Sequence, residues 1–515
     1  MLRFYLICVI ATAATVVRAD LASDGGLPFY TSSWDEWDDH IARWSQYQAP
    51  TFSAVFKPKD ENELSRGLAF MSSNNIQYLA TKSGGHGNIP TLGDYKDVVQ
   101  VSLEGFRRVV VNPDNTVTVG GGAKMMDLIP ALHAASREMT VGSFPCVGVH
   151  GVTLGGGMGR LMGKYGLISD AMRKAKVALW NGSIVEASDE SNTDLFWGLR
   201  GAGHNLGIVI EATFETWPDQ GGMHYNADMV FTDDSIEGVA EAARSIIEDG
   251  LDPLLFLILG FVFDAEKMKP RLFVNIVYAH DAEAGAHVAA RFASTSSDTR
   301  PKITRIVFEE SLMDFADLGS GRALPGVCDV NLQNTLYTAS ASTLFSTDAL
   351  KEVYASYASF VRAHPHANRS ILLFEAASGQ AMNALPADFS AYPHRGKMTT
   401  NAIIQMTWDD DQDRELAEEA VAFGKRTRDL LKAPDASGYD RLYAYVNYAN
   451  SDEPLSAIYG YEEWRHRRLT ALKQKYDPRG VFNAYRPIPL KDVDWVESFP
   501  DAEPGPGPGA EKDEL

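Results

Sequence analysis

Four consecutive residues, Ser83-Gly84-Gly85-His86, combine a loop that can bind an anion with a side chain that can do chemistry beside it. Adjacent glycines let backbone N–H groups converge on an anion without obstruction by side chains. The imidazole of His86 would then lie next to whatever carries the anion. This arrangement predicts a phosphate-bearing cofactor with reactive chemistry at the loop. The alternative at this point is an ordinary Gly-Gly turn followed by a surface histidine.

Three more glycine clusters follow the first, at residues 147–160, 165–170 and 194–209. Close packing of a helix on a sheet explains one such cluster but explains four poorly. No glycine loop ends in Gly-Lys-Ser/Thr, which disfavours a P-loop enzyme. The glycines at 201–207 superficially suggest a Rossmann turn, but they lead into residues 208–212, which predict a strand rather than a helix. We therefore reject a Rossmann domain.

The size and charge of the chain narrow the class of protein. The chain has 515 residues and a formal net charge of −21, so we expect several domain-sized units and no nucleic-acid partner. The sequence suggests no set of metal ligands, so we expect no metal site. Beyond the first 19 residues the cysteines are Cys146 and Cys328. One bridge between them would form in an oxidising compartment, and free thiols are an equal alternative.

Both ends of the chain carry targeting signals. Residues 1–19 predict a signal peptide, with Arg3 before a short apolar stretch and cleavage after Ala19. The last four residues, Lys-Asp-Glu-Leu, are the retrieval address of the endoplasmic reticulum lumen, and secretion is the alternative location. Asn181 and Asn368 are glycosylation acceptors, which fit either location. No other segment has the roughly 18 apolar residues that a membrane span requires.

The elements that must position the glycine loops alternate between short strands and helices. Residues 48–220 combine β-branched runs, for example at 98–103 and 116–119, with helical spacing at 60–71 and 124–136. Mixed short elements of this kind predict an α+β domain.

The middle of the chain has a different texture. Residues 221–440 predict an α/β unit with a substantial antiparallel sheet, because apolar strand patterns at 254–259 and 272–277 alternate with helical patterns. Residues 441–490 return to a strand-then-helix pattern. Residues 491–515 are acidic and rich in proline, which predicts a flexible tail that ends in the retrieval address.

The four glycine clusters, in this order and spacing, resemble the berberine-bridge-enzyme-like branch of the vanillyl-alcohol-oxidase flavoproteins. Tyr445-Val446-Asn447-Tyr448 and the run at 467–482 resemble the closing segment of the same family. The resemblance covers residues 48–215 and 441–490. It implies a PCMH-type FAD-binding domain built from two separated parts of the sequence, with the middle unit as a substrate domain over the isoalloxazine ring.

The resemblance also implies which residues hold FAD. Ser83, Gly84 and Gly85 would bind the pyrophosphate, and His86 matches the histidine that is covalently bonded to the 8α-methyl group of the flavin. The remaining cofactor-binding residues that it implies are Gly87, Val147, Gly148, Gly151, Gly155, Gly156, Gly207, Ile208, Val209 and Asn447.

This sequence departs from the family members that have two covalent links. Those members carry a cysteine where this chain has Phe144, so a single link through His86 is implied. Cys146 lies two positions later and is expected to be a small buried residue rather than a second attachment. Val147 stands where a small residue leaves room for dioxygen, which favours an oxidase that makes hydrogen peroxide. Simple core packing is the alternative for Val147.

Tyr448 matches the family tyrosine that accepts the substrate proton, and an aromatic wall of the pocket is the alternative. A tyrosine with its usual pKa of about 10 needs nearby positive charge or hydrogen bonding to act as a base near neutral pH. In a strand, Tyr445 would point away from Tyr448 and could not share its role. Ile403 takes the place of a lysine that lowers this pKa in some members, which weakens the case for a deprotonated tyrosine. Gln405 could orient the substrate.

These observations predict an FAD-linked oxidase that takes hydride from a small-molecule secondary metabolite and passes electrons to O₂. A carbohydrate oxidase of the same fold is the runner-up, and Phe144 argues against it. A flavoprotein that catalyses oxidative cyclisation, or that binds an inert cofactor, stays open. His150 and His204 are further proton carriers to consider, although such histidines are more often structural. The sequence predicts neither the substrate nor the oligomeric state.

Overall fold

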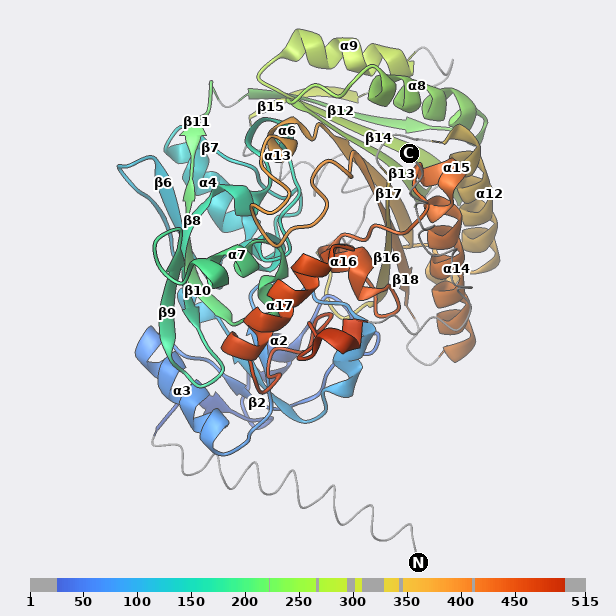
Figure 1. Ribbon diagram of the computed structural model, residues 1–515. Helices are drawn as coiled ribbons and strands as arrows, with labels where there is room; N and C mark the ends of the chain where they lie inside the picture. Colours follow the sequence, from blue (N-terminus) through green and yellow to red (C-terminus); the bar gives the residue numbers. More distant parts are fainter. Residues whose placement is uncertain are drawn as a thin grey trace, which may run out of the picture.

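The computed structural model describes residues 26–221, 223–264, 268–293, 302–307, 328–341, 346–409 and 413–495. The expected signal peptide and the retrieval address lie outside the described residues. Two regions face each other. Segments from both ends of the chain build the first region, and the middle of the chain builds a large sheet (Figure 1).

Two sheets form the core of the first region. In the smaller sheet, ordered β1-β2-β4-β3, both β2 and β3 run parallel to β4. The larger sheet is antiparallel and ordered β5-β6-β10-β8-β9. The strands are β1 (Phe29–Tyr30), β2 (Phe52–Phe56), β3 (Tyr78–Lys82), β4 (Val98–Ser102), β5 (Val109–Val111), β6 (Thr116–Gly120), β8 (Met172–Ala178), β9 (Ile184–Ser188) and β10 (Ile208–Glu215). The strand expected at 208–212 is therefore present.

Helices cover these sheets in the first region, and two of them, at 61–73 and 125–134, lie where the sequence predicted helices. Asp60 caps helix α3 (Glu61–Ser73), because its carboxylate accepts a 2.9 Å hydrogen bond from the backbone N–H of Glu63. The same helix buries Leu64, Leu68 and Met71 on one face. The helices are α2 (Trp37–Ile41), α3 (Glu61–Ser73), α4 (Met125–Ala134), α5 (Val149–Thr153), α6 (Met162–Tyr165) and α7 (Thr193–Ala202).

A seven-stranded antiparallel sheet dominates the middle region, as the sequence predicted. Its order is β15-β12-β14-β13-β17-β18-β16. The strands are β12 (Met223–Phe231), β13 (Leu255–Asp264), β14 (Lys269–Ala279), β15 (Lys302–Val307), β16 (Gln333–Ala341), β17 (Ile371–Ala377) and β18 (Thr400–Trp408). Two-residue strands β7 (Arg137–Glu138) and β11 (Trp217–Pro218) pair with each other near this sheet.

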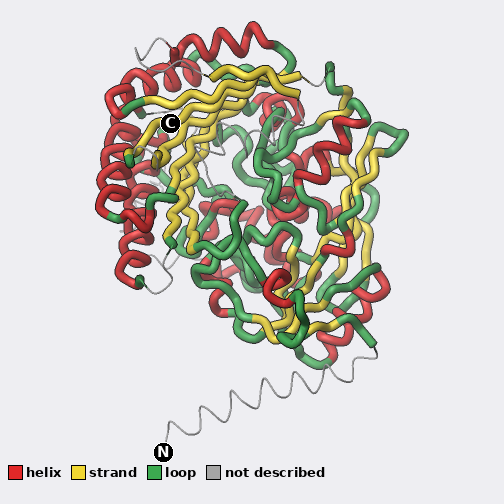
Figure 2. Tube along the Cα trace, turned by 180° about the vertical axis from the view of Figure 1, so that it is seen from behind, coloured by secondary structure: helices red, strands yellow, loops and turns green. Residues whose placement is uncertain are grey.

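Long helices pack on one face of the seven-stranded sheet and leave the other face toward the first region (Figure 2). Helix α12 (Thr347–Ala363) packs on the strands through an apolar stripe, formed by buried residues at helical spacing: Leu350, Val353, Tyr357 and Val361. These helices are α8 (Ile236–Glu248), α9 (Ala282–Ala293), α12 (Thr347–Ala363) and α14 (Arg414–Lys432); the shorter α13 (Gln380–Asn383) and α15 (Pro434–Ser437) lie in connections.

Residues 441–495 return to the first region. The strand expected around Tyr445–Tyr448 is wrong, because residues Val446–Tyr448 form a 3₁₀ turn, and the segment continues into α16 (Leu455–Tyr459) and α17 (Glu463–Tyr476). The buried ammonium of Lys473 donates to the carbonyl oxygens of Asn205 and Phe482 and pairs with Asp477 at 2.6 Å. The bond to Asn205 joins the two separated parts of the first region. Across the described ranges, no helix combines the length and apolarity of a membrane span.

Candidate active site

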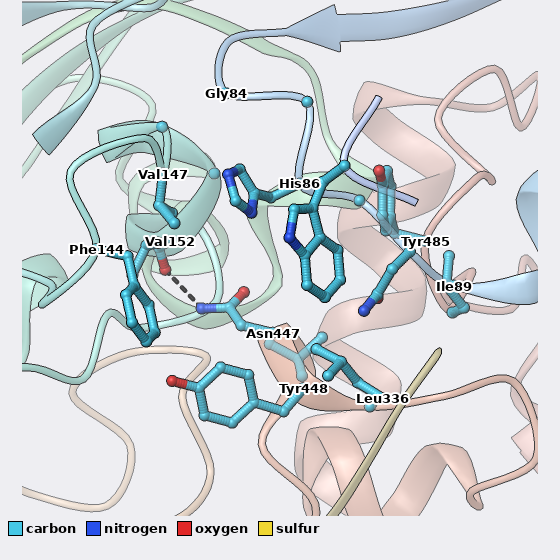
Figure 3. A pocket seen from close by; sticks show the side chains of 18 of the residues that line it. Gly84, His86, Ile89, Phe144, Val147, Val152, Leu336, Asn447, Tyr448 and Tyr485 are labelled. Atoms are coloured by element: carbon cyan, nitrogen blue, oxygen red, sulfur yellow. Dashed lines mark hydrogen bonds between the residues drawn. The ribbon is translucent and has the colours of Figure 1, made fainter. Parts of the chain in front are cut away.

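A cavity lies between the first region and the free face of the large sheet (Figure 3). Its walls bring together glycine loops, the 3₁₀ turn at 446–448, and side chains of three strands, β16, β17 and β18. Residues more than 350 positions apart in the chain therefore share one site, as the sequence predicted for a domain built from two segments.

The glycines of the first loop allow a close backbone contact. A Cβ on Gly84 would lie 2.6 Å from the carbonyl oxygen of Cys146 and 2.7 Å from the backbone nitrogen of Gly148. Gly85 has a φ of +73°, in the left-handed region that favours glycine. The loop at 83–87 can therefore lie this close to the turn at 146–148 only because Gly84 has no side chain, which leaves a cradle of backbone groups.

His86 lines the cavity (Figure 3) and stacks on Trp44, with the ring centroids 5.5 Å apart. Burial, together with the positive charges of Lys124 and Arg43, lowers the pKa of His86 to about 4. The imidazole is therefore neutral at neutral pH. The same two cations favour a negatively charged group at the neighbouring glycine loop.

Nine of the predicted cofactor residues line this cavity. They are Ser83, Gly84, Gly85, His86, Gly87, Val147, Gly148, Gly151 and Asn447. Asn447 is held in place because its amide donates to the carbonyl oxygen of Val152 at 2.8 Å. Both expected catalytic residues, Tyr448 and Gln405, line the same cavity.

The other five predicted cofactor residues, Gly155, Gly156, Gly207, Ile208 and Val209, do not line the cavity. A Cβ on Gly155 would overlap the side chain of Asn447, so this glycine serves the packing behind the site. Gly207 packs against Val177 in the same way. Ile208 and Val209 are buried among core side chains. A cofactor contact at these five positions stays a prediction.

The 3₁₀ turn changes the relation between Tyr445 and Tyr448. Residues three apart in such a turn lie on the same side, and the two rings meet edge to face with centroids 5.0 Å apart. The expectation that they point in opposite directions is therefore wrong. Their hydroxyls still differ, because that of Tyr445 accepts hydrogen bonds of 3.1 Å from the backbone N–H groups of Gly157 and Met158. Tyr445 thus anchors a glycine loop.

Tyr448 contacts a carboxylate that the sequence analysis missed. Its hydroxyl lies 3.3 Å from Oε2 of Glu375 on β17, which is 7% exposed. Burial raises the pKa of Glu375 to about 7, although hydrogen bonds from Tyr448 and Asn401 oppose the rise. Burial and the charge of Glu375 raise the pKa of Tyr448 well above 10. A lone carboxylate in the apolar run at 371–377 was the signal that could have identified it.

The structure decides the pairing of Cys146, which the sequence left open. Cys146 forms a disulfide with Cys328, with the Cα atoms 5.8 Å apart. The bridge ties the loop before Val147 to the segment that leads into β16. Phe144 lines the cavity beside Val147 (Figure 3). The described residues therefore place no free cysteine at this wall.

His150 and His204, the two further proton carriers that the sequence suggested, have different environments. His150 is buried and its Nε2 is 2.9 Å from the carbonyl oxygen of Val119, which marks it as structural. His204 lines the cavity, and its Nε2 is 2.9 Å from the carbonyl oxygen of Gly151. Neither ring contacts Tyr448 through an interaction among the described residues.

Sequence comparisons agree with this geometry. Residues 52–188 match the FAD binding domain family, and residues 444–489 match the berberine and berberine like family. The FAD-linked oxidoreductase OXR1 of Pyricularia oryzae is 31% identical over 88% of this chain and 88% of its own length. The FAD-linked oxidoreductase alt4 of Alternaria solani is 29% identical over 94% of this chain and 98% of its own length.

Solved structures share the fold at low sequence identity. A chitooligosaccharide oxidase is 20% identical, with a TM-score of 0.76 over 92% of this chain and 99% of that one. Physcomitrella patens BBE-like 1 is also 20% identical, with a TM-score of 0.77 and the same coverage. Together with the glycine cradle beside His86, these matches show that this chain belongs to the berberine-bridge-enzyme-like family of FAD-dependent oxidoreductases.

Proposed function

We propose that the protein is an oxidase that removes hydrogen from a small, largely apolar metabolite, with FAD as hydride acceptor and O₂ as final electron acceptor. One observation carries the proposal: Tyr448 lines the same cavity as His86 (Figure 3), and its hydroxyl contacts the buried carboxylate of Glu375 behind the cavity wall. The His86 loop can hold a cofactor and the Tyr448–Glu375 pair can accept a proton. The Cys146–Cys328 disulfide supports the expected location in the endoplasmic reticulum lumen or outside the cell.

The residues of the first region fit FAD. The glycine cradle at 83–87 and 148, with the charges of Lys124 and Arg43 nearby, would hold the pyrophosphate. FAD supplies the redox chemistry when it is bound. A neutral imidazole at His86 has a lone pair on one ring nitrogen, which a single covalent link to the flavin requires. The side chain of Val147, smaller than that of leucine, supports access of O₂ at this wall.

Tyr448 moves a proton rather than standing as a phenolate. Its raised pKa keeps the hydroxyl protonated near neutral pH, and that hydroxyl donates to the carboxylate of Glu375. When the substrate loses hydride from carbon, its hydroxyl or amine proton transfers to Oη of Tyr448, and the phenol proton transfers to Oε2 of Glu375. The pair ends as a neutral phenol and a neutral carboxylic acid, so no charge accumulates on the tyrosine.

The sheet wall of the cavity selects an apolar substrate. Leu336, Ile371, Leu373 and Ile403 line it from three neighbouring strands. An oligosaccharide has hydroxyl groups along its whole length, and these would lose their hydrogen bonds against such a wall. The wall therefore supports a metabolite with an aliphatic or aromatic body over a carbohydrate.

Gln405 is the polar exception on this wall, and a fixed network sets its orientation. The amide of Asn334 donates to the carbonyl oxygen of Trp44 at 3.0 Å, so its own oxygen faces Thr407. The hydroxyl of Thr407 donates to that oxygen at 2.7 Å, and must therefore accept from Nε2 of Gln405 at 3.1 Å. Oε1 of Gln405 remains as an acceptor in the cavity, which supports a substrate with an O–H or N–H group there.

The strand register gives the spacing of the two polar positions. Glu375 pairs with Asn401, whereas Gln405 lies four residues further along β18 and pairs with Ile371. At about 3.3 Å per residue, the two rows are about 13 Å apart along the sheet. This spacing supports a substrate whose oxidised carbon and distant hydrogen-bond donor are separated by an apolar ring system.

Acid precipitation tests cofactor attachment. Wild-type protein and the His287→Ala control, an exposed histidine on α9, should keep yellow flavin in the pellet, whereas His86→Ala should release it. Colourless wild-type protein would refute the proposal. Oxygen consumption with a panel of apolar alcohols and amines then tests the substrate class. Peroxide release with chito- or cello-oligosaccharides instead would favour the carbohydrate oxidase.

A further inference from the structure

Three side chains that commonly bind metals meet outside the cavity, where the first region contacts the large sheet. They are Glu138 on β7, His224 on β12 and His280 directly after β14. Each offers one ligand atom, and these atoms lie within 4.8 Å of one another. The mechanism proposed above uses none of them.

The fold brings the two histidines together through strand register. His224 pairs with Ala279 across the β12–β14 ladder, which places His280 one residue beyond its partner. The ring centroids are 5.2 Å apart. His280 has a φ of 66°, a left-handed conformation that residues with a side chain adopt infrequently. The sheet therefore holds both imidazoles together where β12 begins and β14 ends.

Both carboxylate oxygens of Glu138 lie close to the imidazole of His280, and one of them is also engaged by two other donors. Oε1 accepts from the hydroxyl of Tyr165 at 2.6 Å and from Nζ of Lys164 at 3.1 Å. Nε2 of His280 lies 3.1 Å from Oε2 and 3.2 Å from Oε1. A carboxylate that ligates a metal through one oxygen has its other oxygen held by outer hydrogen bonds in this manner.

All three side chains are shielded from water. Glu138 is 1% exposed, His224 is 2% exposed, and the side chain of His280 is 8% exposed. Two imidazoles and a carboxylate form a common donor set for zinc, with metal bonds of about 2.0–2.2 Å. Two ligands of a tetrahedral ion are then about 3.3 Å apart, close to the 3.1 Å between Oε2 of Glu138 and Nε2 of His280.

We propose that Glu138, His224 and His280 bind one divalent ion of the zinc class, which ties the first region to the large sheet. His224 would close the remaining gap by a shift of about 1.5 Å or less, since no ligand pair exceeds 4.8 Å. Water completes the tetrahedron. The competing arrangement is an ion pair alone, in which a proton on His280 takes the place of the metal and Lys164 supplies the second positive charge.

Metal binding to the flavin-loaded, tag-free protein tests the proposal without any substrate. After treatment with a chelator and dialysis, the protein is titrated with Co²⁺, whose absorption in a tetrahedral site lies at longer wavelength than flavin absorption, and its Zn²⁺ content is measured after re-dialysis. We expect about one equivalent of either ion and a concentration-dependent rise in melting temperature. His280→Ala and the isosteric Glu138→Gln should weaken binding at least tenfold.

His287→Ala provides the matched control, because His287 is an exposed histidine on α9. It should bind the metal as wild type does, and flavin absorbance confirms that each variant is folded. Failure of the wild type to bind Co²⁺ or Zn²⁺ would overturn the proposal in favour of the ion pair. Unchanged binding in both His280→Ala and Glu138→Gln would also overturn it. Either failure leaves the oxidase proposal untouched, because that proposal depends on other residues.

Discussion

Replacement of Glu375 by glutamine tests whether Tyr448 passes its proton to a buried carboxylate. Glutamine keeps the size of the side chain and can still accept a hydrogen bond from Tyr448, but it cannot take up the proton. Loss of a positioned proton acceptor costs about 10²- to 10⁴-fold in rate. We therefore expect flavin reduction to slow by at least about 100-fold in Glu375→Gln.

The pH dependence follows from the pKa of Glu375, which is about 7. Only the ionised carboxylate accepts the proton, so activity is lost as the pH falls through 7. About one tenth of the carboxyl is ionised at pH 6 and about nine tenths at pH 8. The kcat/KM of the wild type should therefore rise about tenfold across this interval. This acidic limb of the pH profile should be absent in Glu375→Gln.

The stability of the protein gives a second readout that needs no substrate. The folded state raises the pKa of Glu375 from 4.5 to about 7, so it binds the proton more tightly than the unfolded chain does. The associated stability is present below pH 4.5 and is lost as the pH rises through 7. Above pH 7, Glu375→Gln should therefore be more stable than wild type by up to about 3 kcal/mol, before any change in hydrogen bonding.

Stopped-flow reduction of the flavin without oxygen measures the first effect, and thermal melts at pH 5 and pH 8 measure the second. Glu415→Gln, at an exposed position on α14, is the control and should match the wild type in both assays. A wild-type profile that is flat between pH 6 and pH 8 would refute the relay. A Glu375→Gln variant with undiminished flavin reduction would refute it equally.

Three further perturbations follow from the same contacts. Tyr448→Phe should slow flavin reduction by about 100-fold and move the acidic limb of the pH profile upward, because removal of a hydrogen bond that lowers the pKa of Glu375 raises that pKa; an unshifted limb would contradict the pairing. Gly84→Ala should reduce the flavin content of purified protein, measured by absorbance, since its Cβ would lie 2.6 Å from the carbonyl oxygen of Cys146. Cys328→Ser should destabilise the protein by roughly 2–4 kcal/mol in denaturant titrations. The double variant that also carries Cys146→Ser should lose no more, and a larger loss would mean that the sulfurs act separately.

Local sequence patterns were sufficient for most elements and for the cofactor side of the site. Helical spacing placed α3 and α4, and β-branched runs placed β4 and β6. The glycine clusters identified the loop at 83–87, because the freedom of the backbone to approach another backbone depends on residue type alone. The strand predicted at 445–448 failed because alternation over four residues is too short to separate a strand from a turn.

The Tyr448–Glu375 pair and the cluster proposed to bind a metal depended on contacts between distant segments. Glu375 and Tyr448 are 73 residues apart and meet only because the closing segment folds against β17. Glu138 and His280 come together through the packing of β7 beside the large sheet. No spacing along the chain encodes either meeting.

The sequence by itself determined that this protein has a glycine loop ending in a histidine and a large antiparallel sheet, and that it resembles a family of flavin-dependent enzymes. Those properties reside in residue types and their local periodicity. Only the tertiary structure decided that Tyr448 faces a carboxylate rather than a cation, that Cys146 is bridged, and that the sheet wall of the cavity is apolar with one oriented amide. The physical reason is that pKa values, disulfides and pocket polarity depend on distance and burial in space, which strand register and packing between the two regions set.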